Sequence, residues 1–169
     1  MRDDGWCRLV VSAPKSEPHP SLSRKHQTRD PMRMATYDEI SIGDTASFTK
    51  TVSETDIYLF AGISGDMNPA HVDAVAAAEG MFKQRIAHGM LSASFISTVL
   101  AMKLPGPGVI YIGQDLQFRG PVFIGDTVTA TVTASEKIEQ RKWVKFKTQV
   151  HNQDGKLVVD GVATVMPPK

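Results

Sequence analysis

The chain has 169 residues, of which 41% are hydrophobic, and its 19 basic and 18 acidic residues leave a formal charge of +1 at pH 7. A single domain with an ordinary core fits that length, and the near-neutral charge argues against nucleic acid or an anionic membrane surface as a partner. Cys7 is the sole cysteine, which excludes an internal disulfide. No apolar stretch reaches the roughly 18 residues of a membrane helix, so we expect a cytoplasmic protein.

Residues 1–35 differ in composition from the rest of the chain. The first 33 hold seven basic and four acidic residues together with four prolines, and they show no helical or strand period. This composition predicts a disordered tail. Two alternatives stay open: a transit peptide, which the two aspartates near the start argue against, and a true start of translation at Met32 or Met34. The folded domain is expected to span residues 36–169.

The folded part begins with a predicted strand over residues 46–52, whose alternate residues share an apolar face apart from Lys50. Ser53, with Asp56 three residues later, predicts the cap of a helix in which apolar residues recur at three and four positions. That helix leads into the polar segment 64–71.

The segment Ser64–His71 reads Ser-Gly-Asp-Met-Asn-Pro-Ala-His and brings a carboxylate, Asp66, near an imidazole, His71. Its glycine and proline predict a loop. Pro69 fixes its own φ and favours an extended conformation at Asn68, so the chain bends between the acid and the base. A carboxylate that orients or deprotonates water and an imidazole that shuttles the proton are sufficient for general acid–base catalysis.

A short alanine-rich helix is expected over residues 74–79, with Asp73 as its cap. After an irregular connection, residues 89–103 are apolar on nearly every side and predict a buried helix, ended by the prolines and glycine at 105–107. The first N–H groups of such a helix have no partner within it. Because Gly89 has no side chain, a substrate carbonyl could approach these donors, and the helix dipole favours the negative charge of an enolate oxygen.

Beyond residue 109 the hydrophobic period changes from that of a helix to that of a strand. Alternating apolar and polar residues predict strands over residues 110–119, 127–134, 143–150 and 157–166, with hairpin-length links between them. Such a succession favours an antiparallel sheet with one apolar face. The predicted fold class is therefore α+β, with the buried helix packed on that face.

The segment Ser64–Asp73, followed by His88-Gly89-Met90, resembles the MaoC-like hot-dog hydratases, and most nearly the (R)-specific enoyl-CoA hydratases. The likeness continues in the family's order and covers about residues 36–166, through Leu104-Pro105-Gly106, Gln117-Phe118 and Pro121–Asp126. It implies a hot-dog fold, in which the sheet wraps the helix and an additional helical overhang carries the motif. It also implies a homodimer that binds the pantetheine arm of its substrate at the subunit contact.

The resemblance implies reversible syn hydration of a trans-2-enoyl-CoA to an (R)-3-hydroxyacyl-CoA. In that reaction Asp66 holds and deprotonates the water that attacks C3, His71 positions the water and protonates C2, and the Gly89 N–H stabilises the thioester oxyanion. Four residues are expected to bind substrate, the last two of which could equally serve helix packing: Asn68, Met90, Ser97 and Leu100. The candidates for contact with the CoA phosphates are Arg85, Lys103 and Arg119.

The remaining polar residues near the motif have simpler interpretations. His88 is expected to anchor the start of the buried helix. Which of Asp66 and His71 carries each proton is left open, because coupled groups titrate as a pair. No metal or cofactor is expected: Asp66, His71, Asp73 and His88 include no His-x-x-x-His pair, and no cysteine lies near them.

Three related functions remain open. They are a 3-hydroxyacyl-[acyl-carrier-protein] dehydratase, a hot-dog thioesterase and a non-catalytic acyl-CoA-binding domain. Retention of both Asp66 and His71 argues against the last of these. A serine hydrolase is disfavoured, since no Gly-x-Ser-x-Gly sequence surrounds any serine.

Overall fold

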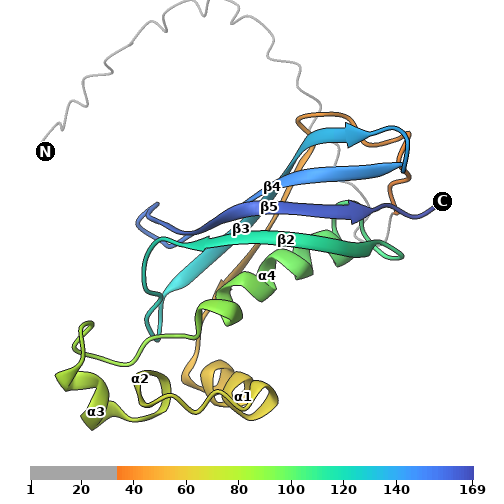
Figure 1. Ribbon diagram of the computed structural model, residues 1–169. Helices are drawn as coiled ribbons and strands as arrows, with labels where there is room; N and C mark the ends of the chain where they lie inside the picture. Colours follow the sequence, from red (N-terminus) through yellow and green to blue (C-terminus); the bar gives the residue numbers. More distant parts are fainter. Residues whose placement is uncertain (1–33) are drawn as a thin grey trace, which may run out of the picture.

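The computed structural model describes residues 34–169, so the predictions for residues 1–33 lie outside the described part. An antiparallel sheet with strand order β1-β3-β4-β5-β2 packs against one long helix, and three shorter helices lie beyond one end of the sheet (Figure 1). No helix of this part is long and apolar enough to cross a membrane. In chain order, the elements are β1 (Thr45–Thr51), α1 (Glu54–Ser64), α2 (Pro69–Val72), α3 (Ala74–Glu79), α4 (Gly89–Met102), β2 (Ile110–Phe118), β3 (Thr127–Ile138), β4 (Trp143–His151) and β5 (Leu157–Met166).

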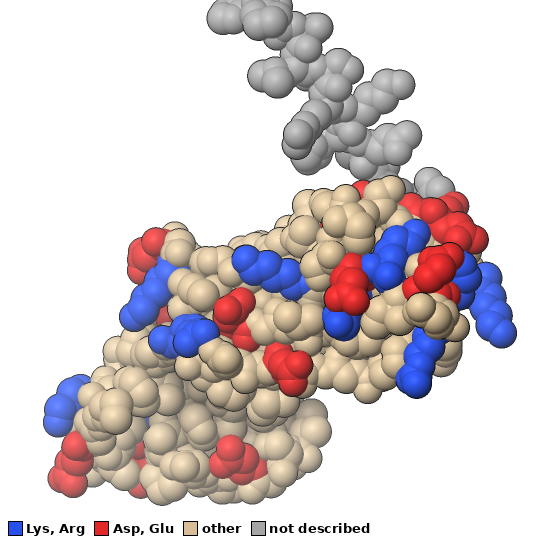
Figure 2. Space-filling model, turned by 45° about the horizontal axis from the view of Figure 1, so that its top comes forward, with Lys and Arg blue, Asp and Glu red and all other residues tan. Residues whose placement is uncertain are grey.

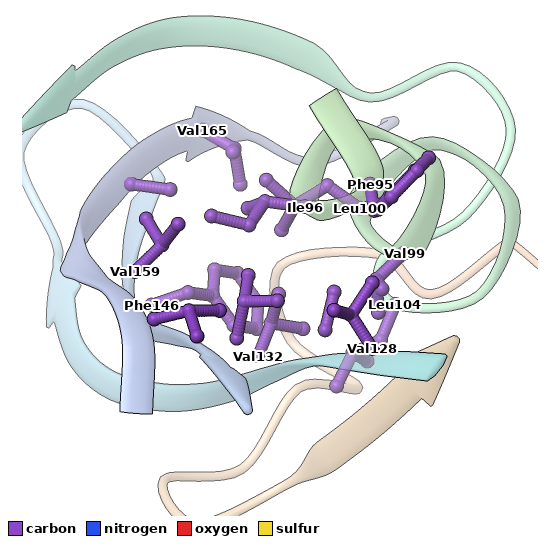
Figure 3. Close-up of a cluster of buried hydrophobic side chains, with 14 of the residues drawn as sticks. Phe95, Ile96, Val99, Leu100, Leu104, Val128, Val132, Phe146, Val159 and Val165 are labelled. Atoms are coloured by element: carbon purple, nitrogen blue, oxygen red, sulfur yellow. The ribbon is translucent and has the colours of Figure 1, made fainter. Parts of the chain in front are cut away.

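The sheet curves around α4, and the facing side chains form one core (Figure 3). This is the wrapping that the family likeness implies. Burial of each large aliphatic or aromatic side chain contributes roughly 1.5–3 kcal/mol, so the core holds the helix in one position. Its members on α4 and the strands include Leu91, Phe95, Ile96, Val99, Leu100, Val132, Phe146 and Val165.

The strict alternation of β3 is realised as predicted. Its valines and alanines from Val128 to Ala134 are buried against α4, while its threonines face outward and are half-buried. Three of these threonines hydrogen-bond to threonines of β1, with Oγ1 separations of 3.2 Å for Thr45–Thr133, 2.9 Å for Thr49–Thr129 and 2.8 Å for Thr51–Thr127. The outer face of β1 and β3 is therefore polar.

The other edge of the sheet, β2, keeps its apolar residues exposed. Ile110, Ile112 and Phe118 are 51%, 41% and 54% exposed, although their alternation suits a buried face. The β2–β5 register shifts between Tyr111 and Gly113, and of the apolar residues of β2 Leu116 is the one that packs against the core. A strand edge with uncovered apolar side chains is typical of a surface that pairs with another chain.

The start of α1 is fixed by the predicted cap. The Asp56 N–H donates to Ser53 Oγ (3.2 Å) and the Ser53 N–H donates to the Asp56 carboxylate (2.8 Å), which together form a capping box. Lys50, the polar exception on the inner face of β1, forms an ion pair with the same carboxylate at 3.1 Å. Burial raises the pKa of Asp56, but the hydrogen bonds from Ser53 and the charge of Lys50 outweigh it and lower the pKa below its usual value.

Candidate active site

Asp66 is placed by the end of α1. Gly65 adopts the left-handed conformation (φ 76°), which a glycine reaches without strain, and its N–H donates to the Ala61 carbonyl at 2.8 Å. The Asp66 N–H then donates to Ser64 Oγ and the Asn68 N–H donates to Asp66 Oδ1, both at 3.2 Å. The turn thus fixes one carboxylate oxygen, while the other has no hydrogen-bond partner among residues 34–169.

The predicted loop after Asp66 is wrong in one part, because Pro69–Val72 forms the one-turn helix α2. Asn68 caps it by accepting a hydrogen bond from the Ala70 N–H at 3.0 Å, and Pro69 occupies the first helical position, where its missing N–H costs nothing. His71 is therefore held on a helix. The expected contact of Asn68 with substrate stays a prediction, since its side-chain oxygen caps this helix.

The imidazole of His71 has a fixed tautomer. Its Nδ1 lies 2.8 Å from the Ile86 carbonyl oxygen, and a carbonyl can only accept, so Nδ1 carries the hydrogen. In the neutral ring Nε2 then offers a lone pair. The Ile86 N–H donates in turn to the Ala70 carbonyl at 3.1 Å, which ties the segment before α4 to α2. The imidazole of His71 is thereby oriented by the Ile86 carbonyl, whose own position is fixed by the bond to Ala70.

His88 connects the motif to the start of α4, as expected of an anchor. It is only 2% exposed, and its Nε2 donates to the Asp66 carbonyl at 2.9 Å. Its ring stacks on His71, with centroids 3.8 Å apart, and lies 5.0 Å from the ring of Phe60. Within residues 34–169 its Nδ1 is buried and has no hydrogen-bond partner. His88 thus sets the separation between the Asp66 turn and the imidazole of His71.

Gly89 is the first residue of α4 and packs closely against the ring of Phe118. A Cβ at this position would lie 2.9 Å from Cε1 and 3.0 Å from Cδ1 of Phe118, which is closer than real Cβ atoms approach other atoms. As the first helical residue, Gly89 has no intrahelical acceptor for its N–H. The positive end of the helix dipole adds to this donor. An oxygen that acquires negative charge would be stabilised here.

These residues share one cavity of about 780 Å³, a size typical of a site for a small organic ligand. Its walls are mostly apolar, and they come from the α1–α2 region, the start of α4, the segment after β2, and β5. The cavity is lined by Phe60, Ser64, Asp66, His71, Phe82, Ile86, Ala87, His88, Gly89, Met90, Ser92, Phe118, Arg119, Gly120, Pro121, Val122 and Val159.

The acid and the base lie within reach of one water molecule. A carboxylate oxygen of Asp66 and a ring nitrogen of His71 are no more than 4.8 Å apart. A water that hydrogen-bonds to both at about 2.8 Å spans such a gap. The arrangement can therefore hold a water between a carboxylate and an imidazole at the wall of an apolar cavity.

Asp66, His71 and His88 also come close enough to be considered as metal ligands, with ligand atoms within 4.8 Å of one another. The two imidazoles, however, are stacked with an interplanar angle of 30°. Lone pairs lie in the ring planes, so those of stacked rings run nearly parallel and do not converge on an ion at the required distance of about 2.0–2.1 Å. This geometry disfavours a metal centre.

The other predicted site residues are divided by the structure. Met90 lines the cavity, whereas Ser97 is exposed on α4 and Leu100 is 1% exposed within the core, and neither lines it. Sequence reasoning missed Ser92, whose hydroxyl is buried at the cavity wall without a partner in the described part of the chain. Its position three residues after Gly89, on the same helical face, was the available signal.

Comparison with known proteins agrees with this geometry. The profile of the MaoC like domain family matches residues 35–155. An (R)-specific enoyl-CoA hydratase from Rhodospirillum rubrum is 56% identical over 132 residues, which cover 78% of this chain and 91% of that protein. A mitochondrial 3-hydroxyacyl-[acyl-carrier-protein] dehydratase from Arabidopsis thaliana is 36% identical over 132 residues, covering 76% and 78%.

Among solved structures, the unliganded R-hydratase PhaJ1 from Pseudomonas aeruginosa superposes with a TM-score of 0.76 at 47% sequence identity, covering 80% of this chain and 87% of that one. The predicted hot-dog fold is thereby confirmed. The family profile matches most of the chain, a relative is 56% identical, and the carboxylate–imidazole motif lies in an apolar cavity. This chain therefore belongs to the MaoC-like domain family.

Proposed function

We propose that this protein is an (R)-specific enoyl-CoA hydratase, which reversibly adds water to a trans-2-enoyl-CoA to give an (R)-3-hydroxyacyl-CoA. The observation that carries the proposal is the separation of at most 4.8 Å between an Asp66 carboxylate oxygen and a His71 nitrogen, at the wall of a cavity that the Gly89 backbone also lines. The likeness to the Rhodospirillum rubrum hydratase supports a CoA thioester as the substrate.

In the proposed mechanism a water donates one hydrogen bond to the Asp66 carboxylate and one to Nε2 of His71. These two hydrogen bonds direct a lone pair of the water oxygen at C3 of the enoyl group. The bond from water oxygen to C3 forms while the C2=C3 electron pair moves onto the thioester oxygen, where the Gly89 N–H stabilises the charge. The Asp66–His71 pair takes up one proton from the water, which places a hydrogen on Nε2 of His71, and Nε2 then donates that hydrogen to C2. Both additions occur on one face, so hydration is syn.

Substitution of the acid and the base tests this function. Asp66→Asn and His71→Ala should each lower kcat for crotonyl-CoA hydration by about 10²- to 10⁴-fold, measured by loss of the enoyl thioester absorbance. Neither side chain belongs to the hydrophobic core, so the circular dichroism spectrum and melting temperature should stay close to wild type. Full activity in either folded variant would refute the proposed mechanism.

The same assay separates the related functions. Faster turnover of a crotonyl thioester on acyl-carrier protein than on CoA would favour the dehydratase, which the likeness to the Arabidopsis thaliana protein keeps as the second candidate. Release of free thiol would identify a thioesterase. Tight acyl-CoA binding without turnover would identify a binding domain.

The expected cytoplasmic location stays a prediction.

We further propose that the active form is a homodimer joined at the β2 edge. Ile110, Ile112 and Phe118 leave exposed apolar side chains along β2, whereas the opposite edge of the sheet, β1, exposes Thr45, Thr49 and Thr51. Ile112→Arg should place a charge in this interface and yield a monomer, as measured by analytical ultracentrifugation. A variant that stays dimeric would exclude β2 as the contact. Phe118, the last residue of β2, packs against Gly89. Loss of the dimer contact along β2 would disturb this packing, so we also expect the monomer to lose activity.

A further inference from the structure

The basic residues that the sequence offers for the CoA phosphates differ in what their side chains contact. The guanidinium of Arg85 donates to the Tyr58 hydroxyl at 2.8 Å and forms an ion pair with Glu54. The Lys103 ammonium donates to the Ser47 carbonyl at 2.6 Å, at the end of α4 opposite Gly89. Neither side chain lines the cavity. Both cations are thus engaged by the protein itself.

Arg119 lines the cavity and keeps most of its donors unused. It follows β2 directly, and its N–H is fixed to the Val158 carbonyl at 2.9 Å. Its side chain is 49% exposed, and the nearest carboxylate, that of Asp160, lies at 4.0 Å, the outer limit of an ion pair. Within residues 34–169 the guanidinium makes no hydrogen bond, so its five N–H donors remain available to a ligand.

A second cation, that of Lys156, lies next to a residue of the cavity wall. The side chain of Lys156 packs against Gly120, which also lines the cavity: a Cβ on Gly120 would lie 3.4 Å from Lys156 Cε and 3.7 Å from Nζ. The backbone of Lys156 is held by Asn152, whose Oδ1 accepts from the Lys156 N–H at 2.9 Å. In the described part of the chain Lys156 forms no ion pair.

We propose that Arg119 and Lys156 bind the phosphate groups of the CoA thioester at the mouth of the cavity, an inference that rests on the proposed function. Guanidinium and ammonium groups are the side chains that recognise phosphate. The pantetheine arm is about as long as four extended residues, roughly 14 Å. When the enoyl group lies at Asp66 and His71, the phosphates are therefore roughly 14 Å away, and we place them beside Arg119 and Lys156.

Local recognition fits the charge distribution of the molecule. The formal charge is only +1, and Figure 2 shows basic and acidic side chains interspersed over the face in view, without a broad area of one sign. A general basic surface therefore does not attract the polyanionic end of CoA on that face. Two cations placed next to the cavity can do so at short range, where screening by salt is weakest.

The test compares crotonyl-CoA with crotonyl-pantetheine, which has the same arm and no phosphate. Arg119→Ala and Lys156→Ala should each raise KM for crotonyl-CoA about 5-fold, and the double variant about 20-fold, with kcat within about 2-fold of wild type. KM for crotonyl-pantetheine should not change. Arg119→Lys should recover part of the loss. Arg141→Ala is the matched control. Arg119 lies near the end of β4, whereas Arg141 precedes the start of this nine-residue strand, so the control removes the same charge about 30 Å from the proposed site.

An unchanged KM for crotonyl-CoA in the double variant, or an equal rise for both thioesters, would overturn this inference and leave the hydratase function intact. Absence of hydration by the wild-type protein would instead contradict the proposed function. In that event calorimetric titration with CoA itself still decides the inference: weaker binding by the double variant than by wild type and Arg141→Ala supports the phosphate site, and equal binding excludes it.

Discussion

Substitution of Gly89 by alanine separates the role of its N–H group from the packing around it. The new Cβ would lie 2.9 Å from Cε1 of Phe118. That ring is 54% exposed, so it can swing away at small cost, and the higher helix propensity of alanine adds up to about 1 kcal/mol of stability. The methyl group would nevertheless occupy the place where a thioester carbonyl approaches the helix. Loss of one oxyanion donor costs about 10²- to 10³-fold in kcat, equivalent to about 2.7–4 kcal/mol.

We therefore expect Gly89→Ala to melt within a few degrees of wild type while kcat for crotonyl-CoA falls by about 100-fold or more. Gly62→Ala is the matched control: it makes the same change within α1, where a Cβ would meet nothing within 4 Å, and it should leave the kinetics unchanged. A Gly89→Ala variant with wild-type kcat would show that this N–H does not stabilise the transition state. A variant that fails to fold would show that Phe118 cannot move, contrary to its exposure.

Three further predictions concern the core and the cap of α1. Leu100→Ala should lower the free energy of unfolding by about 2–5 kcal/mol, measured by urea denaturation, because Leu100 is 1% exposed in the core; acceptance of longer enoyl chains by this variant would assign it to the acyl site as well. Ser53→Ala should cost about 1 kcal/mol through loss of the cap. Since the pKa of Asp56 is lowered in the folded protein, its stabilising contribution is present above its unfolded pKa of about 3.9 and is lost as the pH falls through the lower folded pKa. The stability difference between wild type and Asp56→Asn should therefore be largest near neutral pH and disappear under acid conditions.

Some residues behaved differently from their sequence pattern because a nearby partner decided their role. Asn68 is expected to bind substrate by its place in the motif; its amide oxygen caps α2, and its contact with substrate stays a prediction. Arg85 and Lys103 are candidates for contact with the CoA phosphates by their place in the sequence. In the structure Arg85 forms an ion pair with Glu54, and Lys103 donates to the Ser47 carbonyl of β1. The partners of Arg85 and Lys103 lie more than 25 residues away in the chain, and a local sequence pattern carries no information about such contacts.

The sequence by itself determined most of the secondary structure and singled out Asp66 and His71 as the candidate acid and base. Period and capping are local properties, so the α4 region, the capping box at Ser53 and the alternation of β3 could be read directly. The pairing of strands in the order β1-β3-β4-β5-β2 and the exposure of β2 depend on the curvature of the whole sheet around α4. The tautomer of His71 and its stacking on His88 likewise arise only when the segment before α4 folds back against α2. Tertiary structure alone decided them, because a hydrogen bond or a stacked ring requires atoms from distant segments to meet at a defined distance.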